Sequence, residues 1–195
     1  MRRTLMCAAL FLLFASLVAV AGCGQPPPEA SSPMRGGGTT GGALASAPSP
    51  KHPANATWAG EIELVGFDAI RLGPGMYEVA AYCKPLKRPT TDYVMGLHLV
   101  PANKSVIKSG APLAVPALGA LVWDTFPKPP TSAWEPGKFY RIAMDGAVLA
   151  GGGKWSVKVG FYQVTDGKVV QILSRTDAAA KPGGTTFDSQ QIPFD

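Results

Sequence analysis

The sequence predicts an all-β protein: a single antiparallel β-sandwich of about seven strands, preceded by a signal peptide and a disordered tether. Glycine and proline account for 23 and 19 of the 195 residues. This is about a fifth of the chain against roughly 12% in typical proteins, and it disfavours a helical domain. After residue 57, short runs of alternating apolar and polar residues follow one another with turn residues between them. Antiparallel sheets with one solvated face have this pattern.

The N-terminus has the layout of a targeting signal. Residues 1–22 hold Arg2 and Arg3, then an almost unbroken apolar run from Leu5 to Ala21. A charged start followed by an apolar run is typical of a secretory signal peptide. The run is somewhat shorter than the roughly 20 residues that a spanning helix needs. A membrane helix is therefore the weaker alternative.

The four residues Val20, Ala21, Gly22 and Cys23 resemble the lipobox of bacterial lipoproteins. The resemblance implies cleavage before Cys23, attachment of diacylglycerol to its thiol, and acylation of the new amino terminus with a fatty acid such as palmitate. Two or three acyl chains make a stable anchor, because each buried methylene adds about 0.8 kcal/mol. We therefore expect a cell-envelope protein that is lipid-anchored to a membrane. For a Gram-negative host the resemblance implies the outer membrane, because the residue after the cysteine, Gly24, is not Asp.

Residues 23–57 are expected to be the lipidated cysteine and a disordered tether. From residue 24 to 57 there are seven Pro and six Gly, and the large apolar residues are Met34 and Leu44. Such a segment buries too little apolar surface to offset the entropy of ordering it. The root-mean-square reach of a flexible coil of this length is about 30 Å. The tether would hold the next domain just clear of a membrane surface. His52 lies within the tether, and no function is predicted for it.

Residues 58–173 form the predicted sandwich domain. The alternation places seven strands at residues 58–67, 76–83, 93–100, 118–126, 138–144, 154–164 and 168–173. Asp166-Gly167 lies between two alternating runs and predicts a two-residue hairpin. Seven strands in this length are what an immunoglobulin-like sandwich requires. A barrel built from the same strands is the alternative.

The C-terminal segment, residues 174–195, returns to small and polar residues and is expected to be a mostly irregular tail. Its end carries Phe187, Ile192 and Phe194. These apolar side chains could dock the end of the tail on the sandwich.

Several short motifs occur in an order found in a known β-sandwich domain. They are Gly66-Phe67-Asp68, Leu72-Gly73-Pro74-Gly75, Asp92-Tyr93, His98-Leu99-Val100, Trp134-Glu135-Pro136-Gly137 and Val159-Gly160-Phe161-Tyr162. In these motifs, over most of residues 60–173, the chain resembles the accessory domain attached to mannosyltransferase-type membrane glycosyltransferases. The resemblance implies the fold. It implies no transferase activity, because the transmembrane transferase portion of that family has no counterpart in the sequence.

Charge and ligand-type residues argue against nucleic-acid and metal sites. The net charge is +5, but the lysines are scattered and form no dense basic patch of the nucleic-acid-binding kind. His52 and His98 are the two histidines, too few for a clustered metal site. Asp68, Asp92 and Asp124 lack the close spacing of a calcium loop and are expected to cap turns. We therefore expect no metal, no cofactor and no nucleic-acid partner.

The sequence carries no recognisable catalytic residues. Cys83 is the one cysteine after the lipobox and is expected to behave as a small buried hydrophobe. His98 is expected to be a structural, hydrogen-bonded histidine. An enzyme would need a pocket that joins His98 to a carboxylate and a hydroxyl or thiol. We expect no enzyme, and an envelope hydrolase is the least favoured function.

The expected function is a non-enzymatic binding or structural module of the cell envelope, whose partners are the membrane and an envelope protein or glycan. The alternative is a carbohydrate-binding module. Trp123, beside Asp124, and Trp134, before a turn, are its candidate ligand platform, because amphipathic rings serve well at binding surfaces. Burial of both rings would argue against this alternative.

Overall fold

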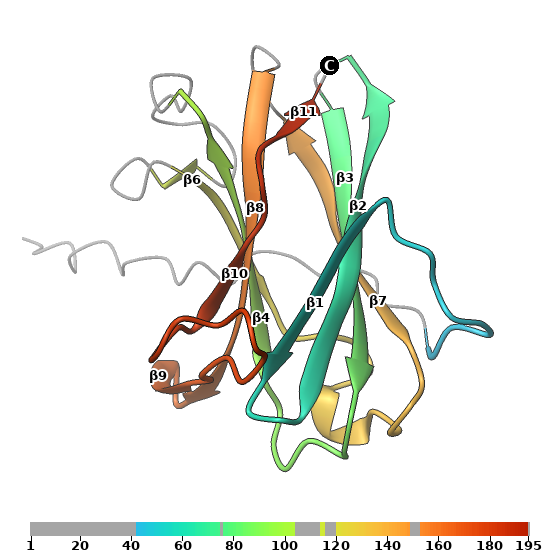
Figure 1. Cartoon of the computed structure of the whole chain (residues 1–195), viewed down its shortest axis with the longest axis vertical. Coiled ribbons are helices and arrows are strands. Elements are labelled where there is room, and N and C mark those ends of the chain that lie inside the picture. Colours follow the sequence, from blue (N-terminus) through green and yellow to red (C-terminus); the bar gives the residue numbers. More distant parts are fainter. Residues whose placement is uncertain (1–41, 75, 104–113, 116–119, 149–152, 195) are drawn as a thin grey trace, which may run out of the picture. The chain divides into compact units, whose positions relative to one another are not determined.

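The computed structural model describes residues 42–74, 76–103, 114–115, 120–148 and 153–194. The signal peptide, the lipobox with Cys23 and residues 24–41 of the predicted tether lie outside the described residues. Within this described part the chain is built almost entirely of β-strands (Figure 1).

The first sheet is antiparallel and has four strands in the order β1-β2-β3-β7. Their bounds are β1 His52–Trp58, β2 Ile62–Gly73, β3 Met76–Pro85 and β7 Tyr140–Val148. The predicted strand 58–67 is wrong, because a turn at Ala59 and Gly60 divides it. Both residues have positive φ, 50° and 62°, and the Glu61 N–H donates to the Trp58 carbonyl at 2.8 Å, which closes the turn. The sheet therefore begins at His52, inside the segment predicted to be tether.

The second sheet has seven strands. Their bounds are β4 Val94–Pro101, β5 Ala114–Val115, β6 Ala120–Thr125, β8 Gly153–Thr165, β9 Lys168–Ile172, β10 Thr186–Asp188 and β11 Ile192–Phe194. β8 is the longest, with 13 residues. It pairs with β4 along one edge and with β9, β10 and β11 in turn along the other. A short 3-10 helix, Thr131–Ala133, precedes β7.

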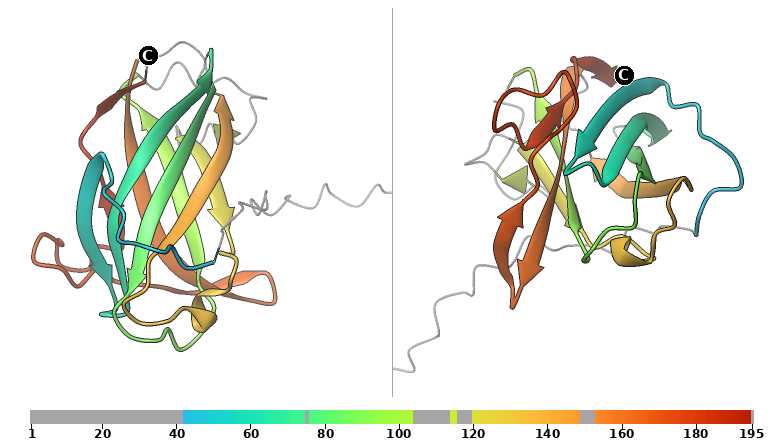
Figure 2. Two further views of the ribbon diagram at one scale, coloured as in Figure 1. Left: turned by 90° about the vertical axis from the view of Figure 1, so that its right-hand side faces the viewer. Right: turned by 60° about the horizontal axis from the view of Figure 1, so that its bottom comes forward.

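The two sheets pack face to face around one hydrophobic core (Figures 1 and 2). Alternate residues of each strand point inward, for example Leu64 of β2, Leu97 of β4 and Val159 of β8. Aromatic rings join the layers: Trp58 of β1 meets Phe161 of β8 edge to face, with ring centroids 5.1 Å apart. The predicted all-β antiparallel sandwich is confirmed.

Most of residues 174–194 is irregular, as predicted, but two short strands within it, β10 and β11, join the second sheet. Phe194 and Ile192 of β11 are buried, and Phe187 of β10 is partly buried against the core. Tyr77 and Phe194 meet edge to face at 5.0 Å. The predicted docking of these apolar residues is confirmed. The sandwich extends beyond the predicted boundaries 58–173, because β1 begins before residue 58 and β10 and β11 lie after residue 173.

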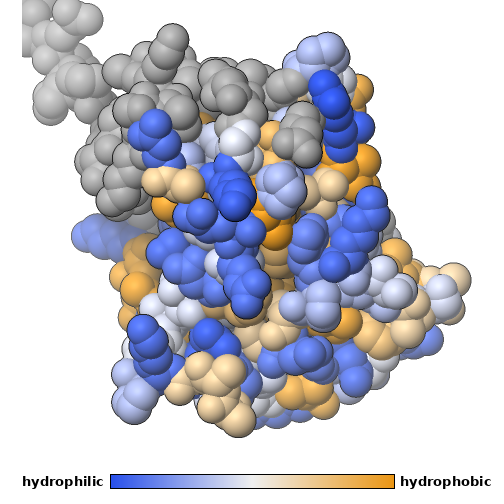
Figure 3. Space-filling view, turned by 45° about the horizontal axis from the view of Figure 1, so that its top comes forward, coloured by the Kyte–Doolittle hydropathy of each residue, from blue (hydrophilic) through white to orange (hydrophobic). Residues whose placement is uncertain are grey.

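No helix in the described ranges has the length and apolarity to cross a bilayer. On the face drawn in Figure 3, hydrophilic side chains cover much of the coloured surface, and the hydrophobic areas lie between them. On β9, three apolar side chains at neighbouring positions are each more than half exposed: Val169, Val170 and Ile172.

Candidate functional site

The edges of the two sheets meet where β1 runs beside the C-terminal residues 174–194, and we call this boundary the seam. At one end the seam is closed by hydrogen bonds, which we call the clasp. Trp58 Nε1–H donates to the Thr185 carbonyl at 2.8 Å, and the Thr176 N–H donates to the Thr57 carbonyl at 2.8 Å. The Thr57 N–H in turn donates to Asp177 Oδ2 at 3.1 Å. The clasp ties the two edges together with few groups left for a ligand.

Asp177 is the centre of the clasp. Its carboxylate forms a two-point pair with Arg175, at 2.9 Å from Nε and 2.6 Å from Nη2. The paired guanidinium lowers the pKa of the Asp177 carboxyl, although partial burial opposes the shift. Both side chains are largely buried. The carboxylate is therefore held ionised and structural.

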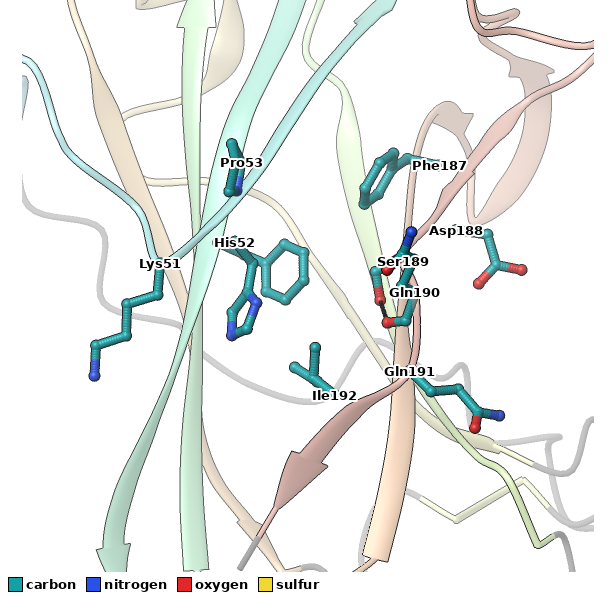
Figure 4. A pocket seen from close by; sticks show the side chains of 10 residues that line it. Lys51, His52, Pro53, Phe187, Asp188, Ser189, Gln190, Gln191 and Ile192 are labelled. Carbon is teal, nitrogen blue, oxygen red and sulfur yellow. Dashed lines mark hydrogen bonds between the residues drawn. The ribbon is translucent and has the colours of Figure 1, made fainter.

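At the other end the seam opens into a cavity of about 380 Å³, which we call the seam cleft. Its lining comes from both edges: Lys51, His52, Pro53 and Phe67 from one side, and Phe187, Asp188, Ser189, Gln190, Gln191 and Ile192 from the other. Figure 4 shows His52 facing Phe187 and Ile192 across the gap, while Asp188 and Gln191 point away from it. The cleft thus joins two segments that are far apart in the sequence.

Aromatic rings form one side of the seam cleft. The His52 imidazole stacks on Phe67 with ring centroids 5.0 Å apart and an interplanar angle of 20°. Phe67 meets Phe187 edge to face at 6.4 Å. Gly66 is needed beside this stack, because an added Cβ would lie only 2.5 Å from the His52 carbonyl oxygen. The close backbone approach holds His52 in place.

The other side carries polar groups as well as Phe187 and Ile192. Ser189 bonds to both backbone groups of Val157 in β8, as a paired strand residue would. Its N–H donates to the Val157 carbonyl at 3.0 Å, and its Oγ accepts from the Val157 N–H at 2.9 Å. The Ser189 hydroxyl also donates to the Gln190 carbonyl at 2.7 Å. These bonds fix the backbone between β10 and β11. The exposed side chain of Gln190 is thereby presented at the cleft.

The predicted tryptophan platform is wrong. Trp123 is 3% exposed and Trp134 is 0% exposed. Trp123 lies on the inner face of β6, and Trp134 stacks on Tyr140 with centroids 4.7 Å apart. The Trp134 indole N–H donates to the Pro129 carbonyl at 3.0 Å. Both rings therefore stabilise the core and present no flat face to a ligand.

His98 lies on the outer face of the second sheet, half-buried, with Nε2 at 3.5 Å from Asp124 Oδ1. Tyr162 hydrogen-bonds to the same carboxylate, and burial first, then Asp124, raises the pKa of the Tyr162 phenol. The structure thus brings together the histidine, carboxylate and hydroxyl that an enzyme would need. The phenol stays protonated near neutral pH, so it serves as a hydrogen-bond donor rather than a nucleophile.

The other candidate residues have structural roles. Cys83 is fully buried, which raises the pKa of its thiol. Asp68 accepts hydrogen bonds from the Lys51 N–H at 2.6 Å and the Tyr82 hydroxyl at 2.9 Å. Asp92 accepts from the Ser132 N–H at 3.1 Å. In the described part of the chain no three His, Cys, Asp or Glu side chains gather as metal ligands would.

The sequence interpretation missed His52 and Gln190. Pro50 and Pro53 flank His52 and made the segment resemble a tether, although Ala56 and Trp58 carry the start of a strand alternation. Gln190 had no signal of its own, since its position depends on how β10 and β11 pair with β8. No protein-family model, curated protein or solved structure matches the chain.

Proposed function

We propose that this protein is a lipid-anchored, non-enzymatic binding module of the bacterial cell envelope that holds a polar ligand in the seam cleft. The observation that carries the proposal is the contrast within the cleft. Stacked rings at His52 and Phe67 lie opposite the exposed amide of Gln190. A few directed polar groups beside an apolar wall are the usual make-up of a binding pocket.

A binding role is supported over catalysis by the state of the candidate nucleophiles. The Cys83 thiol is buried, and burial raises its pKa, so it is held as an inert thiol. A reactive cysteine needs a lowered pKa and access to solvent. The hydroxyl of Tyr162 is likewise held protonated. These groups can shape or bind, but they are poorly placed to attack a substrate.

The anchor rests on the lipobox resemblance at Cys23 and is tested separately from the cleft. Cells that express the Cys23→Ser variant are grown with a radioactive fatty acid. We expect the label to be lost from the variant and kept by the unchanged protein. Label that persists on the variant would refute lipidation at this residue.

The cleft is tested by comparing what binds to matched variants of the purified lipoprotein. The double variant His52→Ala and Gln190→Ala removes one group from each wall. Gln171→Ala, an exposed amide on β9, is the control for the loss of a glutamine elsewhere. We expect the envelope ligand to be retained by the control and lost by the double variant. Equal binding by all three proteins would refute the cleft as the site.

A glycan is the ligand class favoured by the cleft, since the partly exposed His52 ring can pack on a sugar and the Gln190 amide can bond to its hydroxyls. This candidate replaces the tryptophan platform with His52 and Gln190. Soluble fragments of the envelope glycan are titrated into the protein while its amide spectrum is followed. Shifts confined to residues 187–192 and 51–53 are expected. Shifts spread evenly over the sandwich would argue against glycan binding there.

A further inference from the structure

A second hollow lies on the outer face of the seven-stranded sheet, separate from the seam cleft. Gly96 of β4 pairs with Gly160 of β8, so two glycines lie side by side in the middle of the sheet. On one side, Asp124 of β6 pairs with Gly96, and on the other side, Thr186 of β10 pairs with Gly160. Because neither glycine has a side chain, the floor between these two residues is bare backbone.

The space above this floor, which we call the glycine groove, has a volume of about 180 Å³. Its walls include His98, Lys158, Tyr162, Ile172, Thr185 and Thr186. A protein cavity of about 150 Å³ is known to hold benzene. The groove therefore has room for one small ring or a short aliphatic chain.

Beside the groove lies the carboxylate of Asp124, which is bonded to Tyr162 and has one oxygen left without a donor. The Asp124 side chain is only 9% exposed, and its Oδ1 accepts no hydrogen bond. The lysine on the groove wall, Lys158, pairs with Asp188 at 2.9 Å. A buried acceptor without a donor is costly, most of all when it is charged. Asp124 is thus an acceptor that a ligand could satisfy.

Three different groups converge on one point over Gly96. The position of an added Cβ at residue 96 would lie 2.9 Å from Asp124 Oδ1, 3.5 Å from Tyr162 Cε1 and 3.6 Å from His98 Nε2. An anionic oxygen and an imidazole nitrogen can both accept hydrogen bonds from one donor group. An aromatic ring also attracts a cation. Residue 96 has no side chain to separate these groups, so they lie close together above its Cα.

We propose that the glycine groove binds a primary ammonium group on a short aliphatic stem. The ammonium donates hydrogen bonds to Asp124 and His98, and the stem lies over Gly96 and Gly160 against Tyr162 and Ile172. Because Asp124 Oδ1 is buried beside the groove, the proposal requires the His98 side chain, 33% exposed, to turn outward and admit the ammonium. A ligand carboxylate would be repelled by the Asp124 carboxylate. A ligand alcohol would leave the negative charge of Asp124 without a counterion.

The charge requirement is tested with three probes of equal length: pentylammonium, pentan-1-ol and pentanoate. Each is titrated into the purified lipoprotein and followed by calorimetry and amide shifts. We expect pentylammonium to bind at least about tenfold more tightly than the alcohol, because hydrogen bonds to charged groups are the stronger ones. Equal affinity for the ammonium and the alcohol would overturn the proposal.

Two variants place the binding at the groove. Asp124→Asn keeps the shape and removes the charge, so it should weaken pentylammonium about tenfold or more. Asp166→Asn makes the same chemical change at an exposed turn with positive φ, and it should bind as the unchanged protein does. Full affinity in the Asp124 variant would contradict the proposal.

A further variant, which narrows the groove, tests the site even if Asp124→Asn fails to fold. An added Cβ at Gly160 would meet Thr185 O and a Thr186 methyl at 3.5 Å, which is ordinary contact. Gly160→Ala should therefore fold, as a thermal melt can verify, yet lose affinity for pentylammonium. Unchanged affinity in this folded variant would place the amine elsewhere and overturn the proposal.

The natural source of the amine is either a free amine or a lysine side chain of a partner. Pentane-1,5-diamine represents the first source, and lysine with blocked amino and carboxyl ends represents the second. Both carry the proposed chemistry, and the tighter probe identifies the source. Failure of both to compete with pentylammonium would contradict the proposal. The Gln190→Ala variant should not change any of these affinities, because Gln190 lies in the other site.

Discussion

The two ends of the seam use the same pair of chain segments for opposite purposes. At the closed end, Trp58 and Asp177 bond with the facing edge, and the polar groups there are one another's partners. At the open end, the Ser189 hydroxyl bonds to its own neighbour Gln190 and to Val157. Among the residues that the structure describes, no such hydrogen bond spans the gap at the open end, where a cavity lies between His52 and Gln190.

The contrast teaches how a cleft can be kept open in a small sandwich. The clasp fixes the distance between the edges, so the open end does not need ligand-binding groups to hold itself together. At the open end, the rigidity comes from local features: the Ser189 bonds on one wall and the His52–Phe67 stack on the other. Removing clasp groups should thus cost stability, whereas removing cleft groups should cost binding.

The largest effect is expected for Trp58→Ala at the closed end. This change removes a fully buried ring that contacts Phe161 and loses the bond to Thr185. Truncation of a buried aromatic residue to alanine costs about 3–5 kcal/mol. Urea unfolding followed by circular dichroism should show a loss of this size. Trp58→Phe, which keeps most of the packing, is the control, and a loss below about 1 kcal/mol for the alanine variant would contradict the role of the clasp.

A smaller loss is expected for Gly66→Ala at the open end. The new Cβ would lie 2.5 Å from the His52 carbonyl oxygen and 2.5 Å from Pro50 Cγ. Something must move, and overpacking of this kind costs about 1–3 kcal/mol. Because residues 50–53 would be displaced, ligand binding should fall as well. Gly73→Ala, where an added Cβ meets nothing within 4 Å, should leave both binding and stability nearly unchanged.

Much of the fold follows from local patterns, which is why the sequence predicts it. The Asp166-Gly167 hairpin was predicted from its two residues, and Asp166 and Gly167 indeed have positive φ. The turn at Ala59 and Gly60 was missed because alanine rarely adopts positive φ. The strand at His52–Trp58 was missed because Pro50 and Pro53 resemble a tether. In the folded protein, pairing with β2 and the hydrogen bonds of the clasp stabilise this strand despite the two prolines.

The sites depend on contacts across the sheets, which a sequence pattern does not record. The neighbours of Trp123 and Trp134 in the chain made them candidates for a ligand platform, yet both are buried. The pairing of Gly96 with Gly160, far away in the sequence, needs the register of β4 against β8. The sequence could supply His98 as a candidate, but its approach to Asp124 needs the neighbouring strand β6.

A moderate effect that depends on pH is expected for Asp177→Asn in the clasp. Arg175 lowers the pKa of Asp177 in the folded state, relative to about 3.9 in an unfolded chain. The stabilisation is therefore complete above pH 4 or so, and it is lost as the pH falls through the folded pKa. At pH 7 the variant should lose about 1 kcal/mol, measured by urea unfolding. The difference between the two proteins should shrink steadily in acid, and a difference that stays constant down to about pH 2 would contradict this.

The smallest effect on stability is expected for Gln190→Ala in the seam cleft. The side chain is exposed, and substitutions of exposed residues usually change stability by less than about 0.5 kcal/mol. Binding of the cleft ligand should nevertheless weaken, because an amide that bonds to the ligand is removed. The comparison with Asp177→Asn is the sharpest test of the seam: the clasp variant should lose stability and keep binding, and the cleft variant should do the reverse. If both variants lost stability alone, the open end would be a packing defect rather than a site.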